Sequence, residues 1–431
     1  MSKPFQDPFS RRTFVTTAAK SFLGLGTLPL LGSWSNADTP KTLNTVGGKA
    51  KSVIYVYLGG GMSHLDTLDT KPGAETQGPV ESIKTNADGV MLSEFFPALS
   101  TQANHLAIIN SMNSTQGAHA QGRYFMHTSY FMRGTVQHPH MGAWASKHLP
   151  KRNKSLPANI KIGGDSNGLG AGFLESRHGA LPIGDPEAGL QYSKLPKRVT
   201  NSQFASRMAK LKKMNRGFSE VYDTKLSRAY ASMYDEAVKL MKSKDLEAFD
   251  LTLENEVKRE RYGLNDFGQG CLLAKRLVEQ GVRFIEINNG GWDTHDSNFT
   301  RVEEKARVLD QGLGALIADL AASNLLDQTL VVLATEFGRT PTIFAERNNG
   351  RNHYPQAFSC MLAGGGIKGG IKYGKTDEEG REVTEDMVVI PDFNATIAHA
   401  MGIPVEKKVM SPDLRPFTVA DKGKPILELF A

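Results

Sequence analysis

Four segments of this sequence gather carboxylates, imidazoles and hydroxyls beside glycines. Each segment directly follows a short apolar run that is predicted to be a buried strand. The segments are residues 59–69, 111–119, 290–296 and 336–340, and the last is followed by a further polar stretch at 350–353. In an open α/β sheet, ligands bind at the carboxyl ends of the strands. We therefore expect the four segments to meet in one binding or catalytic site.

Aspartate and histidine pairs on separate strands can converge on one or two divalent ions, because oxygen and nitrogen ligands suit such cations. A hydroxyl at the start of the helix after the second strand would face that cation as a nucleophile, and an arginine nearby could bind an anionic ester. Structural alternatives remain: Asp66 as a helix N-cap, His295 as a hydrogen-bonded histidine, and Arg339 as an ion-pair partner of Glu336. The glycine run 364–366 fits either a phosphate-binding loop or a turn.

The elements that position these residues are predicted from hydrophobic periodicity. Short runs rich in β-branched and aromatic residues predict strands at 52–58, 106–110, 284–288, 329–335 and 358–363. Amphipathic patterns between them predict helices at 267–279, 300–323 and 392–401, the last with Asp392 as its N-cap. Strands that alternate with helices of this length predict an α/β fold, with a mostly parallel central sheet covered by helices on both faces.

The N-terminal segment has the layout of an export signal. Arg11 and Arg12 precede an apolar stretch at 14–31, and a run of small residues ends at Ala37. This layout resembles a twin-arginine signal, which implies export in the folded state by the twin-arginine machinery to the periplasm or the outside of a bacterial cell. We expect residues 1–37 to be the signal peptide, 38–50 a linker and 51–431 one α/β domain, with a lysine-rich helical insertion at 200–262.

Bulk properties exclude several classes of protein. The chain of 431 residues has a formal charge of +6. Four basic residues and one acidic residue fall within 1–37, so the cleaved chain would carry about +3, too little to indicate nucleic-acid binding. No later segment approaches the roughly 18 apolar residues of a membrane span. Cys271 and Cys360, the only cysteines, lack the spacing of a zinc or redox motif. They are predicted to be two separately buried thiols, with a disulfide, which export would permit, as the alternative.

The polar segments also carry a family resemblance. The chain resembles the bacterial domain-of-unknown-function family 1501, whose fold belongs with the alkaline phosphatase-like (sulfatase-like) superfamily. The resemblance covers essentially the whole chain after the signal. The matching positions are 59–69 with 71–72, Ser111-Met112 with His119, Gly263 with 271–274, 291–295, 326–332, 336–341, His353 and 362–366.

The resemblance implies roles for individual residues. Enzymes of the superfamily place a carboxylate after the first strand, a nucleophile after the second, and Asp and His ligands after later strands. Carried over, Ser114 becomes the nucleophile, with Thr115 and Ser111 as alternatives, and His119 and Arg339 complete the catalytic group. The implied ligands of one or two divalent ions, Zn, Ca, Mg or Mn, are His64, Asp66, Asp293, His295, Glu336 and His353.

Three departures from the superfamily pattern bear on the chemistry. Many of its phosphatases have an Asp-His pair where this chain has Glu336-Phe337, which removes one imidazole. The two-residue spacing from Asp293 to His295 is shorter than the usual four. The Cys/Ser-x-Pro-x-Arg motif of ordinary sulfatases does not occur. One ion, or none, is therefore an alternative to a two-metal site.

These observations lead to three functional hypotheses. The first is an exported metal-dependent hydrolase of phosphate or sulfate esters, with carbohydrate esters as one substrate class. The second is a non-catalytic periplasmic binding or scaffold protein that retains the fold, and the third is a phosphotransferase or mutase. The expected partners are an anionic ester and, because members of the family are expected to be encoded beside another exported protein, a protein of that kind. The oligomeric state is left open.

Overall fold

The computed structural model describes residues 48–164, 170–191, 193–221 and 235–431. The predicted signal peptide, and the predicted linker up to residue 47, lie outside the described residues. Within the described part of the chain, no helix is long and apolar enough to cross a membrane.

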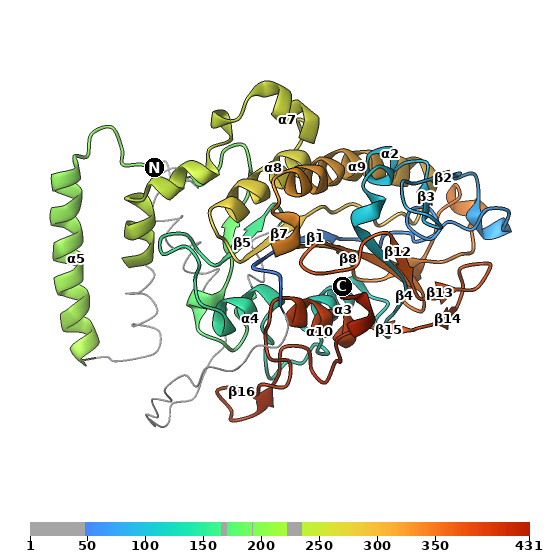
Figure 1. Cartoon of the computed structure of the whole chain (residues 1–431). Coiled ribbons are helices and arrows are strands. Elements are labelled where there is room, and N and C mark those ends of the chain that lie inside the picture. The colour runs from blue at the N-terminus through green and yellow to red at the C-terminus, as the bar shows by residue number, and fades with distance from the viewer. Residues whose placement is uncertain (1–47, 165–169, 192, 222–234) are drawn as a thin grey trace, which may run out of the picture.

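A nine-stranded sheet forms the centre of the molecule (Figure 1). Its order is β12-β4-β11-β8-β1-β7-β5-β6, with β15 also pairing with β4. The strands are β1 (Ser52–Leu58), β4 (Leu106–Asn113), β5 (Asn159–Ile162), β6 (Leu181–Ile183), β7 (Phe284–Asn288), β8 (Thr329–Thr335), β11 (Phe358–Ala363), β12 (Ile371–Tyr373) and β15 (Val388–Val389). All five predicted strands are present, and β1, buried along its whole length, lies between β7 and β8.

The sheet is parallel except at one strand. β1 runs parallel to β7 and β8, whereas β11 pairs antiparallel with both β4 and β8. The prediction of a mostly parallel sheet is thus confirmed. The reversal of β11 has a consequence for the site, because the start of this strand, and not its end, lies at the edge where the other strands end.

The glycine run after β11 therefore lies at the opposite edge of the sheet. Gly364, Gly365 and Gly366 have positive φ angles of 67°, 59° and 93°. The amide of Gly365 donates to the carbonyl of Leu326, and a Cβ on Gly364 would lie 2.6 Å from the carbonyl oxygen of Thr329. Because β8 begins at Thr329, this run is a tight turn beside the start of β8, away from the predicted site.

Helices cover both faces of the sheet, as predicted (Figure 1). On one face of the sheet lie α2 (Pro97–Ser100), α7 (Glu256–Tyr262), α8 (Asp266–Glu279) and α9 (Asn298–Ala322). On the other face lie α3 (His119–Thr128), α4 (Met141–His148) and α10 (Ile390–Ala400). Alternate residues of β1 supply the two cores: Ile54 and Val56 face the first, and Val53 and Tyr55 the second.

Two helix details differ from or refine the predictions. The helix α10 begins at Ile390, two residues before its predicted N-cap, because Pro391 occupies its first turn. The Asp392 carboxylate accepts the amide of Lys424 instead of capping the helix. The helix α8 begins with an N-cap of a typical residue type, since the Asn265 side chain accepts the amide of Gly268.

The two thiols lie in different cores. Cys271 belongs to the core beneath α8 and α9, and Cys360 to the core on the opposite face of the sheet. Both are buried and free, which confirms the prediction of two separate thiols.

Within the stretch 200–262, the structure has α5 (Asn201–Val221), two short 3-10 helices (Lys244–Phe249 and Leu251–Leu253) and α7. The helix α5 lies at one edge of the molecule, away from the sheet (Figure 1). By contrast, α7 is joined to the body, since the Tyr262 hydroxyl donates to Asp319 of α9 over 2.9 Å. Whether this stretch is an insertion into the domain stays a prediction.

Small two-stranded sheets complete the chain. They pair β2 (Ser82–Lys84) with β3 (Met91–Ser93), β9 (Gly338–Arg339) with β10 (His353–Tyr354), β13 (Lys375–Thr376) with β14 (Val383–Glu385), and β16 (Val409–Met410) with β17 (Pro416–Phe417). The β9–β10 pair sets His353 opposite Arg339, just beyond the end of β8. This pairing brings a histidine from far along the sequence to the edge where β1 and β7 end.

Candidate metal centre

Four side chains meet at this edge of the sheet, and we refer to them as the open cluster: His119, Asp293, His295 and His353. His119 is the first residue of α3, and Asp293 and His295 lie in the loop that follows β7. Their side chains, with that of His353, are between 24% and 44% exposed. The open cluster can therefore be reached from solvent.

The contacts within the open cluster are centred on Asp293. Its carboxylate oxygens lie 3.3 Å from His119 Nε2, 3.2 Å from His295 Nε2 and 3.5 Å from His353 Nε2. The Nε2 atoms of His295 and His353 are 2.9 Å apart. Ligand atoms held by a tetrahedral ion at about 2.0–2.1 Å are separated by about 3.3 Å. The ligand atoms of His119, Asp293 and His353 lie within 4.8 Å of one another, so these three residues can share one ion, and His295 lies beside Asp293 and His353.

The protonation of His119 is set by a buried carboxylate. Its Nδ1 lies 3.0 Å from Oε1 of Glu336, whose residue is 2% exposed. The carboxylate of Glu336 also accepts the Tyr57 hydroxyl at 2.7 Å and the Gly60 amide at 2.8 Å. Burial alone would raise the pKa of Glu336, but these hydrogen bonds hold it below its ordinary value. A proton on Nδ1 of His119 leaves the Nε2 lone pair directed at Asp293.

The other two imidazoles are oriented in the same way. Nδ1 of His295 lies 3.0 Å from Oδ1 of Asn352, and Nδ1 of His353 lies 2.8 Å from the carbonyl oxygen of Gly117. When each Nδ1 donates to its oxygen, each Nε2 presents a lone pair. Such outer hydrogen bonds are the usual means of fixing a metal-binding histidine.

This arrangement leaves an excess of acceptors. Within the described residues, His119 Nε2 is buried and has no hydrogen-bond partner, although Asp293 Oδ2 lies 3.3 Å away. Three Nε2 lone pairs and a carboxylate repel one another unless a cation or additional protons lie between them. The donor set of His119, Asp293 and His353, two imidazole nitrogens and one carboxylate, fits a divalent transition metal and leaves a fourth tetrahedral position for water or substrate.

Arg339 supports the open cluster from behind. Its side chain is fully buried, and its Nη2 lies 2.5 Å from Oδ1 of Asp293. The same guanidinium donates to the carbonyls of Gly60, Gly61 and Arg351. Partial burial would raise the pKa of Asp293, but the ion pair with Arg339 lowers it. The structure thus makes Arg339 a positioning residue for Asp293, with four hydrogen bonds to the protein itself, rather than a partner of Glu336.

The structure places Asp66 and His64 elsewhere. The Asp66 carboxylate forms a bidentate ion pair with Arg351, with both distances at 2.9 Å and neither side chain exposed, and it also accepts Asn298 Nδ2 at 2.8 Å. His64 is fully buried with Nε2 2.9 Å from the carbonyl oxygen of Gly380, and its burial lowers its pKa. Neither residue is therefore brought into the open cluster.

The candidate nucleophiles are also engaged within the protein. Ser114 directly follows β4, is 5% exposed, and its Oγ accepts the Gln116 amide at 3.1 Å. Ser111 lies within β4 and donates to the carbonyl of Asp386, while Thr115 Oγ1 accepts from the Gln116 side chain. In the part of the chain that the structure describes, none of these hydroxyls is hydrogen-bonded to the open cluster.

The six predicted metal ligands thus fall into two groups. The structure brings Asp293 and His353 together with His119, a residue predicted for catalysis rather than as a ligand, and places His295 beside Asp293 and His353. Glu336, Asp66 and His64 lie outside this set, with Glu336 directly behind His119. The sequence analysis missed Asn352 and Tyr57 as supporting residues. The adjacency of Asn352 to His353 was the one signal that could have indicated such a role.

Fold and cluster together define an α/β protein with a candidate metal centre at the carboxyl edge of a mostly parallel sheet. A family model described as "Protein of unknown function (DUF1501)" matches residues 50–430, and the chain belongs to this family. No curated protein matches the chain.

Several solved structures are similar to the chain at a distance. The lipoteichoic acid synthase of Listeria monocytogenes is 11% identical, with 90% of this chain and 79% of that chain covered and a TM-score of 0.44. A protein in the alkaline phosphatase superfamily from Vibrio parahaemolyticus is 10% identical over 98% and 80% of the two chains, with a TM-score of 0.42. The phosphonate monoester hydrolase of Silicibacter pomeroyi is 11% identical over 88% and 76%, with a TM-score of 0.40. At these TM-scores the likeness says nothing about the chemistry of this chain.

Proposed function

We propose that this protein is an exported, metal-dependent hydrolase of phosphate or sulfate esters, with carbohydrate esters as one substrate class. The observation that carries the proposal is that the ligand atoms of His119, Asp293 and His353 lie close enough to share one ion, with the Nδ1 of each histidine facing an acceptor. Once bound, a divalent ion supplies stabilisation of negative charge and lowers the pKa of a nucleophile beside it.

The ligand set favours one ion of the zinc type. Calcium and magnesium prefer oxygen ligands, whereas imidazoles suit zinc or a similar transition metal. The carboxylates needed for a second ion are engaged elsewhere, because Asp66 pairs with Arg351 and Glu336 accepts three hydrogen bonds. We therefore propose a centre with a single ion.

Exposure of the open cluster favours catalysis over a purely structural role. The His119 Nε2 atom is itself buried, but the side chains of His295 and Asp293 are 36% and 44% exposed, so a substrate oxygen can approach the open cluster from their side. Structural metal sites are closed, while catalytic sites keep one position open to solvent. Glu336 keeps Nδ1 of His119 protonated, and Arg339 holds Asp293 in place.

Metal content and ester hydrolysis, measured together, test this proposal. The wild type and a His119→Gln/His353→Gln variant would be compared on aryl phosphates and aryl sulfates after loading with Zn²⁺. His105→Gln is a matched control, because His105 precedes β4 and so lies at the opposite edge of the sheet. We expect one ion and turnover in the wild type and the control, and neither in the double variant. An ion with no hydrolysis of any ester would contradict the proposed activity.

A second candidate function is binding without catalysis. It is favoured by the hydrogen bonds of Ser114 and Arg339, which commit the predicted nucleophile and the predicted anion-binding arginine to the protein itself. A Ser114→Ala variant separates the two functions. If the variant restores a deletion phenotype as well as the wild type does and retains its ion, Ser114 is not the nucleophile. If it also hydrolyses no ester, the binding role is supported.

Export by the twin-arginine route is part of the proposal and rests on Arg11 and Arg12 in the sequence. An Arg11→Lys/Arg12→Lys variant expressed from its own promoter tests it by cell fractionation. We expect the wild type in the periplasm or medium and the variant in the cytoplasm. Equal export of both would contradict this route.

A further inference from the structure

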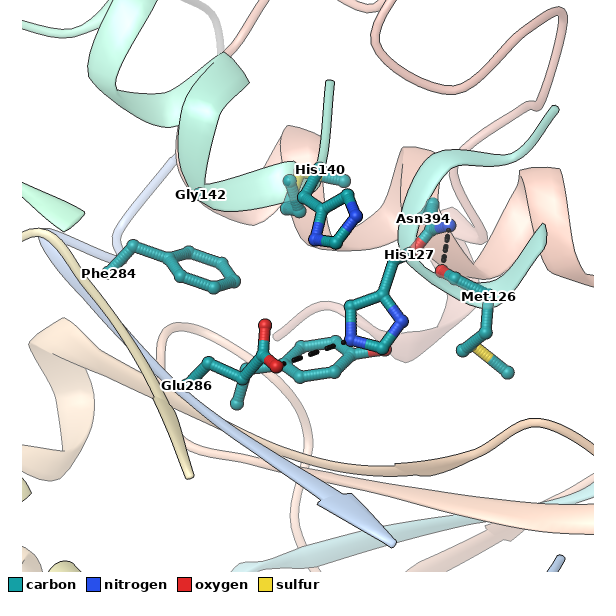
Figure 2. Close-up of a pocket in the computed structure, with 9 residues that line it drawn as sticks. Met126, His127, His140, Gly142, Phe284, Glu286 and Asn394 are labelled. Atoms are coloured by element: carbon teal, nitrogen blue, oxygen red, sulfur yellow. Dashed lines mark hydrogen bonds and ion pairs between the residues drawn. The ribbon is translucent and has the colours of Figure 1, made fainter. Parts of the chain in front are cut away.

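A second group of ligand-type side chains lies inside the molecule, and we refer to it as the buried cluster: His127, His140 and Glu286. Glu286 is in the middle of β7, His127 is in the last turn of α3, and His140 directly precedes α4. Figure 2 shows the three side chains pointing toward one another between the sheet and these helices. None of them belongs to the open cluster.

The geometry of the buried cluster resembles that of the open one. One ligand atom from each of the three residues lies within 4.8 Å of the other two. His127 Nε2 is 3.4 Å from Glu286 Oε1, while His127 Nδ1 lies 2.8 Å from the carbonyl oxygen of Arg123. A proton on Nδ1 again leaves a lone pair on Nε2, directed at a carboxylate.

A cavity of about 10 Å³ lies among these side chains and is also lined by Tyr55 and Asn394. A volume of this size holds a single water molecule or ion. The Tyr55 hydroxyl and Asn394 Oδ1 are buried without a hydrogen-bond partner among the described residues. Tyr55 is only 2% exposed, so its hydroxyl cannot be satisfied by bulk water. The cavity therefore contains unsatisfied polar atoms that point to an occupant.

The balance of donors and acceptors distinguishes the candidate occupants. The cavity is lined by a carboxylate, two imidazoles and an amide oxygen, all of which can accept or coordinate. A water molecule can donate to only two of them, with its oxygen accepting from the Tyr55 hydroxyl, whereas a cation interacts with all four. Asn394 cannot simply reverse its amide, because its Nδ2 donates to the carbonyl of Met126 and to Ser129.

We propose that the buried cluster binds one divalent transition-metal ion through His127, His140 and Glu286, as a structural site separate from the open cluster. Two imidazoles and a carboxylate suit zinc or a similar ion. The cavity has no room for a substrate besides the ion, so this site is closed. By joining α3 and α4 to β7, the ion would hold both helices against the sheet.

Lys161 competes for the same carboxylate. Its Nζ lies 3.9 Å from Glu286 Oε1, beyond hydrogen-bond distance but close enough to balance the charge. The three ligands and Lys161 together carry no net negative charge when the histidines are neutral. We therefore expect weaker binding here than in the open cluster.

The test is a titration of metal-free full-length protein with Zn²⁺, followed by native mass spectrometry. Three proteins are compared: the wild type, the open-cluster variant His119→Gln/His353→Gln, and His140→Gln. We expect two equivalents in the wild type and one in each variant. The ion that remains in the open-cluster variant should be released slowly by a chelator, because His127 and Glu286 are buried and His140 is only partly exposed.

A folded open-cluster variant that takes up no Zn²⁺ at micromolar excess would overturn the inference and indicate a water molecule in the cavity. If His140→Gln does not fold, the wild type and the open-cluster variant still decide the result. One equivalent in the wild type and in the open-cluster variant, with none in His140→Gln, would support the buried site and contradict the proposed catalytic centre.

Discussion

The open and buried clusters are built from the same residue types but differ in their position on the sheet. The open cluster lies beyond the ends of the strands, where loops bring Asp293 and His353 together with 44% and 24% of their side chains exposed. The buried cluster uses Glu286, a residue within β7 that is 7% exposed. Position along a strand thus separates a site that a substrate can reach from one that can hold only an ion or a water molecule.

The electrostatic surroundings of the two clusters differ as well. In the open cluster, the hydrogen bond to Glu336 raises the pKa of His119, although partial burial opposes this. In the buried cluster, burial and the neighbouring His127 lower the pKa of His140 to about 3. Burial would raise the pKa of Glu286, but His127 and Lys161 hold it far below its usual range. A charge is therefore tolerated in the interior only because partners surround it.

The largest expected effect is the loss of catalysis in the open cluster. His119→Gln/His353→Gln removes two imidazole ligands, and because the ion would supply several kcal/mol of charge stabilisation, we expect turnover to fall by about 1,000-fold. His140→Gln should leave turnover within a few-fold of the wild type. Steady-state hydrolysis of the best ester substrate measures both variants. An equal loss of turnover in the two variants would mean that the open and buried clusters do not differ in their importance for catalysis.

The next effect concerns folding. Glu286→Ala leaves His127 and Lys161 without their buried carboxylate, and we expect the free energy of unfolding to fall by about 3–5 kcal/mol. His295→Gln, whose side chain is 36% exposed, should change it by less than about 1 kcal/mol. Urea denaturation of the metal-free proteins checks both. A small effect of Glu286→Ala would mean that the interior charge is not needed for stability.

A smaller effect is expected for the support of the open cluster. Glu336→Gln keeps the side-chain shape but weakens the hydrogen bond to Nδ1 of His119. We expect Zn²⁺ affinity at the open cluster to fall by about 10–100-fold. Competition with a fluorescent chelator measures the affinity. Asn352→Ala, which removes the neutral partner of His295, should have less effect, and the reverse order would argue against the role assigned to Glu336.

A pH dependence of stability is expected in all variants alike. Burial lowers the pKa of His138, His148 and His178 to about 4 in each case. The unfolded chain, with histidine pKa values near 6.5, then binds more protons between pH 6.5 and pH 4, so stability should decrease as the pH falls through this range. Urea midpoints of the metal-free protein at pH 7 and pH 5 measure the decrease. A midpoint that rises on acidification would contradict it.

The strands and their covering helices could be predicted because apolar runs and 3.6-residue periodicity are local properties. The direction of β11 could not, because nothing in its composition distinguishes a parallel strand from an antiparallel one. Because β11 is antiparallel to β8, its start, which follows His353, lies at the site, and its end, which leads into the glycine run 364–366, lies at the opposite edge of the sheet. Asp66 was predicted as a ligand from its position after the first strand and from the family resemblance. Its ion pair with Arg351 could not be predicted, because the two residues are 285 positions apart in the sequence.

The open cluster itself was predicted in part. Asp293, His295 and His353 stood at strand ends, where α/β proteins bind ligands, whereas His119 was separated from its strand by a loop and was assigned to catalysis. The buried cluster was missed because the sequence analysis looked only beyond the strands. Glu286, a charge in the middle of an apolar strand, was the available signal.

The most direct test of the central claim is anomalous diffraction at the zinc edge from crystals of the full-length protein grown with Zn²⁺. The account predicts a strong anomalous peak bounded by Asp293 and by the Nε2 atoms of His119 and His353. A map with these side chains ordered as described, but with no peak among them, would contradict a metal centre at this edge of the sheet.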